Sequence, residues 1–206
     1  RFKSHYSTTP LLQLFRFSMR IIGGKYKGRV LETFSGEDIR PTSDKVREAI
    51  FDILGKIPEG AKVLDLFAGT GALGFEAVSR GAKMVTMVEK DRRALRIIRE
   101  NIRILGLGDR VEIISEDYRK ALRRLGRKRR SYGLVFADPP YKMLGTDNGI
   151  EKLLYLLDGS DSLKPGALVI IEHFLKIDLP LELSGWRTVK RKQYGQTGIS
   201  IFQRQN

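Results

Sequence analysis

The chain has 206 residues, of which 41% are hydrophobic and 30% are charged. This composition predicts one globular domain with a sizeable core and excludes a disordered chain, and no apolar run approaches the length that spans a bilayer. The formal net charge of +14 points to a polyanionic partner, most often nucleic acid, with a merely basic surface as the alternative.

Cysteine and histidine usage narrows the possible chemistry. The sequence contains no cysteine and two histidines, His5 and His173. Disulfides, thiolate metal sites and cysteine nucleophiles are therefore excluded. Two isolated histidines argue against a histidine metal site or a catalytic triad, so no metal is expected. The absence of cysteine also fits a reducing compartment, and a cytoplasmic protein is expected.

Residues 1–18 differ in composition from the rest of the chain. They contain no acid and are rich in Ser and Thr, and Met19 follows them. We expect this leader to lie outside the fold, as a vector-derived or upstream-translated segment. An organelle transit peptide is the alternative, because it shares the arginine- and serine-rich, acid-poor composition.

Residues 19–60 are expected to form a hairpin and a helix that pack on a larger domain of residues 61–206. Two short apolar runs between Met19 and Phe34 are separated by a basic turn, which predicts the hairpin. A helix then begins near Thr42, Ser43 or Asp44. Its predicted apolar face consists of Val46, Ile50, Phe51, Ile53 and Leu54.

From Lys62 onward, strand-like and helix-like stretches alternate. Buried strands are predicted at residues 63–67, 84–89, 111–115, 134–137 and 168–172, and the clearest helix at 92–105. This α/β alternation predicts a mostly parallel sheet with helices on both faces. The tail breaks the alternation, and it predicts an antiparallel C-terminal hairpin around residues 195–198 that closes one edge of the sheet.

The stretch "DLFAGTGALG", residues 65–74, lies between the first predicted strand and a helix. Gly69 and Gly71 allow the backbone to turn sharply and to approach a ligand. Glu89, at the end of the next strand, is placed to accept hydrogen bonds from the ribose of an adenosine cofactor. The alternative is that the glycines only permit close packing of a helix on a strand.

Asp65 helps to choose the cofactor. A carboxylate four residues before Gly69 repels the pyrophosphate of a dinucleotide but suits the ammonium and sulfonium groups of S-adenosylmethionine. Asp65 could instead only cap the loop backbone. Asp117, after the third strand, could bind the adenine amino group or be an ordinary acid at a helix start.

The stretch "DPPY", residues 138–141, follows the fourth predicted strand. Two prolines stiffen this backbone. The Asp138 carboxylate and the Pro139 carbonyl could then accept both hydrogens of one amino group, while Tyr141 stacks on the base that carries it. Such an arrangement favours methyl transfer to nitrogen, with Asp138 receiving the proton of the product amine. The alternative is a Pro-Pro turn that only ends a strand.

These motifs resemble the class I S-adenosylmethionine-dependent methyltransferases that act on amino nitrogens. Together with "MRIIGGKYKGR", "RPTSDKVREAIFDIL" and "YGQTGISIF", they most closely resemble the bacterial small-subunit (16S) rRNA guanine-N2 methyltransferases of the RsmD type, over residues 19–202. The resemblance implies a Rossmann-like seven-stranded sheet, no metal, and methylation of a guanine in a partly or fully assembled small subunit.

The same resemblance and the glycine loop define the expected site. The expected cofactor-binding residues are Asp65, Phe67, Ala68, Gly69, Thr70, Gly71, Glu89, Lys90 and Asp117. The expected catalytic residues are Asp138, Pro139, Pro140 and Tyr141.

Basic residues are expected to hold the RNA. The run "RKALRRLGRKRR", residues 119–130, has eight basic residues and no acid, which favours phosphate contact over a solvated helix face. Arg40, Thr42 and Arg47 are expected either at the cavity mouth or in caps and salt bridges of their own helix. Further basic patches are Arg20, Lys25, Lys27 and Arg29, and Arg187, Lys190, Arg191 and Lys192. The predicted RNA contacts are Lys25, Lys27, Arg29, Arg40, Thr42, Arg47, Arg123, Arg124, Arg127, Lys128, Arg129 and Arg130.

We expect a monomer that binds ribosomal RNA and no membrane. A DNA adenine-N6 methyltransferase is the nearest rival, but it usually needs a target-recognition segment for which the chain has no room. A protein glutamine methyltransferase would more often carry Asn in place of Asp138. A nicotinamide-dependent oxidoreductase is disfavoured by Asp65, and a non-catalytic RNA-binding protein would leave "DPPY" unexplained.

Overall fold

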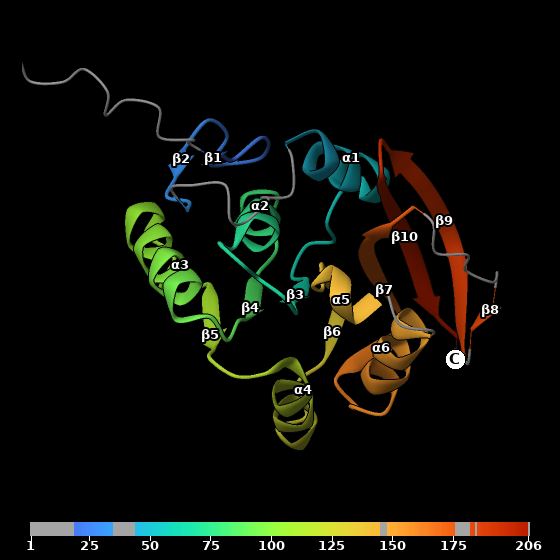
Figure 1. Ribbon diagram of the computed structural model, residues 1–206. Coiled ribbons are helices and arrows are strands. Elements are labelled where there is room, and N and C mark those ends of the chain that lie inside the picture. Colours follow the sequence, from blue (N-terminus) through green and yellow to red (C-terminus); the bar gives the residue numbers. More distant parts are fainter. Residues whose placement is uncertain (1–18, 35–43, 145–147, 176–181, 184, 206) are drawn as a thin grey trace, which may run out of the picture.

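An eight-stranded sheet in the order β5-β4-β3-β6-β7-β10-β9-β8 forms the centre of the molecule (Figure 1). The computed structural model describes residues 19–34, 44–144, 148–175, 182–183 and 185–205. The leader and the predicted RNA contacts Arg40 and Thr42 lie outside the described residues.

Five neighbouring strands of the sheet are parallel, which confirms the predicted α/β pattern. They are β3 (Lys62–Asp65), β4 (Met84–Val88), β5 (Val111–Ile114), β6 (Tyr132–Ala137) and β7 (Leu163–Phe174). The last strand begins earlier than predicted, because Leu163 pairs with Tyr132 before a shift in register.

The C-terminal strands are antiparallel, as the tail sequence predicts. β10 (Thr197–Arg204) lies between β7 and β9 (Trp186–Tyr194), so the chain turns back into the sheet instead of only bordering it. The expected number of seven strands is wrong by one. The additional strand is the two-residue β8 (Glu182–Leu183), which pairs with β9 at the edge.

Helices cover both faces of the sheet (Figure 1). α1 (Asp44–Leu54), α2 (Ala72–Ser79) and α3 (Arg92–Leu105) pack in one core cluster. α4 (Tyr118–Arg127), α5 (Tyr141–Leu144) and α6 (Gly149–Asp158) pack in the other. Successive strand residues alternate between the clusters, as Val63 and Leu64 do, because side chains of a strand point to opposite faces.

The N-terminal hairpin of β1 (Met19–Arg20) and β2 (Val30–Leu31) is tied to α2. The Ile22 amide donates to Oε2 of the buried Glu76 at 2.9 Å, and the Lys25 amide donates to the Ser79 carbonyl at 2.8 Å. Gly24 has φ +75°, and a Cβ there would overlap the Ser79 carbonyl. The hairpin therefore shares one core cluster with the sheet, while the division of the chain at residue 60 stays a prediction.

Helix α3 begins and ends where the sequence predicts, because both of its caps are visible in the sequence. The Asp91 side chain accepts from the Arg93 and Ala94 amides at 2.8 and 2.9 Å, and Gly106 ends the helix with φ +65°. No helix among the described residues has the length and apolar character needed to cross a membrane.

Candidate active site

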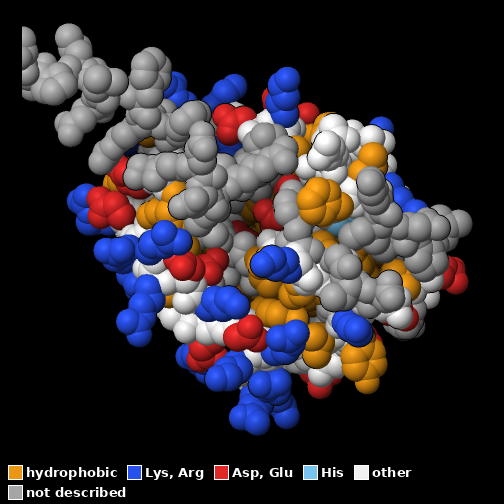
Figure 2. All heavy atoms as spheres, in the orientation of Figure 1, with side chains coloured by type: hydrophobic (Ala, Val, Ile, Leu, Met, Phe, Trp, Pro, Cys, Tyr) orange, Lys and Arg blue, Asp and Glu red, His pale blue; other side chains and the backbone are white. Residues whose placement is uncertain are grey.

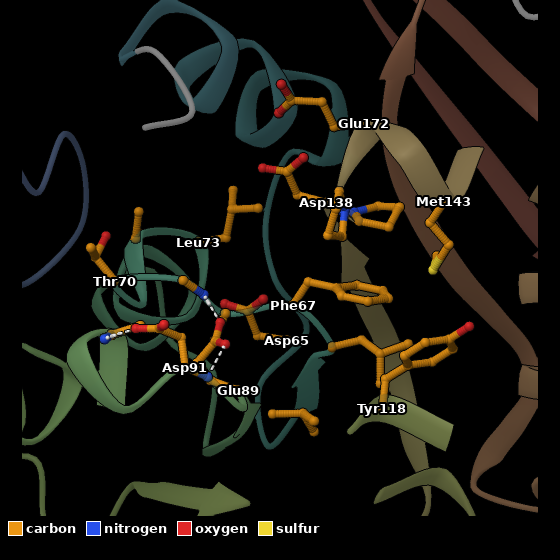
Figure 3. Close-up of a pocket in the computed structure, with 18 of the residues that line it drawn as sticks. Asp65, Phe67, Thr70, Leu73, Glu89, Asp91, Tyr118, Asp138, Met143 and Glu172 are labelled. Atoms are coloured by element: carbon orange, nitrogen blue, oxygen red, sulfur yellow. Dashed lines mark hydrogen bonds between the residues drawn. The ribbon is translucent and has the colours of Figure 1, made fainter. Parts of the chain in front are cut away.

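Each of the five parallel strands brings an acidic residue to the same edge of the sheet. In spatial order from β5 to β7, these are Asp117, Glu89, Asp65, Asp138 and Glu172. All five line one cavity of about 1340 Å³, and Figure 3 shows Glu89, Asp65, Asp138 and Glu172 around it. Because parallel strands end at one edge, acids far apart in the sequence meet there. Four of them are among the site residues predicted from the sequence, and Glu172 is not.

The glycine loop turns between β3 and α2 as predicted. Gly69 has φ +54° and Gly71 has φ +86°, a region that favours glycine. A Cβ at Gly71 would lie 2.5 Å from the Phe75 ring, whereas one at Gly69 would meet nothing within 4 Å. Gly69 and Thr70 line the cavity, and Gly71 is absent from its lining. Gly71 thus serves the turn itself.

Glu89 holds the loop and the end of its own strand. Its Oε2 accepts from the Gly69 amide at 2.8 Å, and its Oε1 accepts from the Lys90 and Asp91 amides at 2.7 and 2.8 Å. A carboxylate has about four lone-pair sites, so Glu89 retains acceptor capacity toward the cavity that it lines.

Asp65 is buried beneath the loop, with 2% of its surface exposed. Burial raises its pKa from 3.8 to about 7. The Gly74 amide, which donates to Oδ2 at 3.0 Å, opposes this rise, and the negative charges of Asp138 and Glu89 add to it. Asp65 therefore ties the loop to α2 and also lines the cavity. Its two predicted roles, a partner of the cofactor and a cap of the loop backbone, are compatible.

Aromatic side chains form a wall of the cavity. The Phe67 and Tyr118 ring centroids lie 4.9 Å apart, and the Arg119 guanidinium lies 4.7 Å from the Tyr118 centroid. Tyr118 and Arg119 were missed as cavity residues, although both follow the predicted Asp117 directly. Asp117 caps α4 by accepting from the Arg119 amide at 3.0 Å and also lines the cavity.

The "DPPY" segment follows β6 on the other side of the cavity. Asp138, Pro139 and Pro140 line it, and the Pro140 carbonyl accepts from the Met143 amide at 2.8 Å as α5 begins at Tyr141. Figure 3 shows Asp138 and Glu172 on one side of the cavity, with Glu89 and Asp91 on the other. The site thus has a half with the glycine loop and a half with "DPPY".

The basic run of residues 119–130 forms α4 and the turn after it. Figure 2 shows Lys and Arg side chains gathered over α3 and α4 on the face that it presents. Two of the basic residues are ion-paired, Arg124 with Glu116 at 2.8 Å and Arg130 with Glu112 at 3.2 Å. The ten-residue helix is about 15 Å long, so the later part of the run lies away from the cavity.

The prediction that Arg47 contacts RNA is wrong for this structure. Its side chain is 1% exposed and is absent from the cavity lining. The guanidinium donates to the Arg20 carbonyl at 2.6 Å and to Asp44 Oδ1 at 2.9 Å. Arg47 therefore joins α1 to the N-terminal hairpin. Its contact with Asp44 agrees with the alternative prediction, a salt bridge within its own helix. Lys25, Lys27 and Arg29 are exposed on that hairpin, outside the cavity lining.

The C-terminal hairpin contributes residues that the sequence analysis did not assign to the site. Its turn brings Tyr194, Gly195 and Thr197 to the cavity. A groove of about 390 Å³ between α1 and β9 continues from there, because Lys45 and Tyr194 line both. Lys190 also lines the groove, on the exposed face of β9.

Comparison with known proteins places the chain in a family. The family described as "Conserved hypothetical protein 95" matches residues 19–203. "Ribosomal RNA small subunit methyltransferase D" of Escherichia coli K12 is 34% identical over 187 residues, covering 91% of this chain and 90% of that protein. The same-named protein of Haemophilus influenzae is also 34% identical, over 90% of this chain and 93% of that protein.

Comparison with solved structures also finds methyltransferases. An Escherichia coli protein provisionally described as the methyltransferase yhhF has 31% identity and a TM-score of 0.77, covering 91% of this chain and 98% of that one. A methyltransferase solved with SAH shares the fold alone, at 16% identity and a TM-score of 0.63, covering 77% of this chain and 48% of that one. The fold is that of the class I methyltransferases, and the chain belongs to the "Conserved hypothetical protein 95" family, the RsmD family of methyltransferases.

Proposed function

We propose that this protein transfers a methyl group from S-adenosylmethionine to the N2 amino group of a guanine in small-subunit ribosomal RNA. The named relatives support the wider class, an S-adenosylmethionine-dependent methyltransferase of ribosomal RNA. Transfer to the amino group of a guanine is supported by the two-sided cavity, in which the glycine loop and its strand-end acids face the "DPPY" segment and Glu172.

The residues present fit S-adenosylmethionine in the loop half of the cavity. Gly69 lines the cavity, and a Cβ added there would meet nothing within 4 Å, so the loop backbone is open to a ligand. Asp65, buried and with a raised pKa, is a site where a nearby cation would be favourable, and an ammonium and a sulfonium are such cations. When bound, the cofactor supplies an electrophilic methyl group carried on that sulfonium.

The other predicted cofactor contacts follow from their places around the cavity. Glu89 would accept from the ribose hydroxyls, while Asp117 would accept from the adenine amino group. The ring pair of Phe67 and Tyr118 would contact the flat adenine. Ala68, Thr70 and Lys90 line the same half.

In the acceptor half, Asp138 and the Pro139 carbonyl would accept the two hydrogens of the target amino group. An exocyclic amine is a poor nucleophile, because its lone pair is delocalised into the ring. Acceptors on both N–H bonds stabilise the tetrahedral nitrogen of the transition state, and they align the lone pair with the methyl group. Asp138 then takes the proton that the product amine must lose.

The RNA would be held by phosphate contacts around the cavity. The exposed residues of the basic run, Lys25, Lys27 and Arg29 on the N-terminal hairpin, and Lys190 in the groove beside α1 are the candidates. Phosphate contacts position a substrate without choosing its sequence. The target guanine must be unpaired or flipped for its amino group to reach Asp138 in the cavity. Ribosomal RNA as substrate also supports the expectation of a cytoplasmic protein.

The test is methyl transfer from tritiated S-adenosylmethionine to three acceptors in parallel. These are unmodified small ribosomal subunits, naked small-subunit rRNA and duplex DNA, with the labelled nucleoside identified after digestion. N2-methylguanosine in either RNA sample supports the proposal, and it distinguishes assembled from naked substrate. N6-methyladenine in DNA, or no label with cofactor binding intact, contradicts it.

A further inference from the structure

We propose that Glu172 determines specificity for guanine by accepting a hydrogen bond from the guanine N1–H, next to the amino group that is methylated. The inference rests on the proposed function and assigns a role to an acid that the sequence analysis did not identify. It concerns recognition of the base and not the transfer step itself.

The position of Glu172 relative to Asp138 comes from the sheet. Ala137, the last residue of β6, and Ile171 of β7 are register partners in a parallel pair. Asp138 directly follows β6, and Glu172 is the next residue of β7. Register partners in parallel strands point to the same face. Figure 3 shows both side chains at the same side of the cavity, and both residues line it.

Glu172 belongs to the acceptor half and not to the cofactor half. The strand-end acids of the cofactor half, Asp117, Glu89 and Asp65, follow or end β5, β4 and β3, whereas β6 lies between β3 and β7, the strand of Glu172. Glu172 is 7% exposed and is the register partner of Ile199 in β10. A carboxylate held there faces the base and lies away from the ribose and adenine contacts.

Guanine presents donors that match these two acids. Its Watson–Crick edge carries N1–H beside one N2–H bond, and the second N2–H bond of the same amino group points to the sugar side, so three donors follow one another around this part of the ring. Neighbouring strands lie about 4.8 Å apart, and Glu172 is one methylene longer than Asp138. Glu172 can therefore reach N1–H while Asp138 and the Pro139 carbonyl hold the amino group.

The same carboxylate rejects bases that lack N1–H. An ionised carboxylate only accepts hydrogen bonds, and adenine and 2-aminopurine present a lone pair at N1. Burying the Glu172 carboxylate against the N1 lone pair leaves both acceptors without a donor, which costs free energy. Recognition of an N–H group is therefore far more selective than recognition of shape alone. 2-Aminopurine is the diagnostic base, because it retains the 2-amino group and lacks only N1–H and O6.

The experiment compares guanine with 2-aminopurine at the target position of otherwise identical RNA. Wild-type protein, Glu172→Gln and the matched control Glu182→Gln, which changes an exposed acid of β8 outside the cavity lining, are assayed for kcat/KM on both. A glutamine amide can donate to the N1 lone pair of 2-aminopurine. Cofactor affinity and thermal unfolding are measured for each variant.

We expect wild type and Glu182→Gln to prefer guanine by about tenfold or more. We expect Glu172→Gln to lose most of that preference, by a lower rate on guanine and an unchanged or higher rate on 2-aminopurine. Equal losses on both bases would assign Glu172 a general positioning role and overturn the inference. If Glu172→Gln does not fold, a wild-type preference near one overturns it as well. The RNA that carries guanine tests the proposed function separately from the role of Glu172. If the wild-type protein forms no N2-methylguanosine in this RNA, the proposed function is refuted.

Discussion

The carboxylate of Asp65, the last residue of β3, accepts a hydrogen bond of 3.0 Å from the amide of Gly74, in the first turns of α2. The contact ties together the two ends of the glycine loop. A Cβ at Gly74 would lie 3.1 Å from Asp65 Oδ2 and would overlap Met87. The third glycine of the loop is therefore required for the close approach of helix and strand, whereas Gly69 lines the cavity and Gly71 permits the turn.

Cofactor affinity is expected to depend on the protonation of Asp65. Its pKa of about 7 in the absence of ligand means that this carboxyl is largely protonated below that pH, whereas a cationic cofactor favours the ionised form. Affinity should rise as pH increases through about 7, with release of a proton on binding below that value. Calorimetry in buffers of different ionisation enthalpy measures this proton, and Asp65→Asn should bind weakly and without it. An unchanged proton release in Asp65→Asn would contradict the assignment.

The same pKa predicts a contribution of Asp65 to stability versus pH. A carboxyl whose folded pKa is raised binds more protons when folded, so its contribution is fully present below the unfolded value of 3.8 and is lost as pH rises through about 7. The free energy of unfolding of ligand-free wild type should therefore fall more steeply across this window than that of Asp65→Asn. Urea unfolding at a series of pH values measures the difference, and identical slopes would refute the raised pKa.

Asp138→Ala should lower kcat by about a hundredfold or more, because it removes an acceptor that acts on the developing charge at nitrogen. The dissociation constant of S-adenosylmethionine should change little, since Asp138 lies in the acceptor half. Single-turnover kinetics and calorimetry give the two values. The control is Asp109→Ala, an exposed acid outside the cavity lining. Equal loss of turnover and cofactor binding would make Asp138 structural.

Glu76→Ala should destabilise the fold and loosen the N-terminal hairpin. The Glu76 side chain is fully buried, accepts from the Ile22 amide at 2.9 Å and pairs with Arg80 at 2.7 Å. Removing Glu76 leaves the Ile22 amide without its acceptor and the partly exposed Arg80 guanidinium without its carboxylate, and we expect a loss of about 2 to 3 kcal/mol in the free energy of unfolding. Urea unfolding measures it, with the exposed Glu59→Ala as control. A loss no larger than that of the control would show that the hairpin is held by other contacts.

Neutralising basic residues of α4 and its following turn should weaken RNA binding and flatten its salt dependence. The variant replaces Arg123, Arg127 and Arg129 by Gln and leaves the ion-paired Arg124 and Arg130 in place. Each lost phosphate contact lowers the slope of log K against log salt by about 0.7 to 0.9.

Filter binding to small-subunit rRNA across salt concentrations measures this slope. The control replaces the exposed Lys56, Lys62 and Lys83 by Gln, which changes the net charge equally. A slope that changes no more than in the control would indicate that residues 119–130 form a solvated helix face and do not contact phosphate.

Most strands and the caps of α3 could be predicted from the sequence, because they depend on local patterns. Asp91 and Gly106 mark the ends of that helix by their own hydrogen-bonding and backbone preferences. The burial of Arg47 could not be predicted in this way. Its exposure depends on whether the N-terminal hairpin lies over α1, and the Arg20 carbonyl that it contacts is distant in the sequence.

The sequence alone determined the fold class, the glycine loop and four of the five strand-end acids of the cavity, since each follows a predicted strand or lies in a short motif. Only the tertiary structure showed that Glu172 shares the acceptor half with Asp138, that Tyr118 pairs with Phe67, and that the C-terminal hairpin turn lines the same cavity. The physical reason is strand order. β10 lies beside β7 and β7 beside β6, and such long-range pairing decides which side chains meet, whereas local sequence decides only that each strand forms.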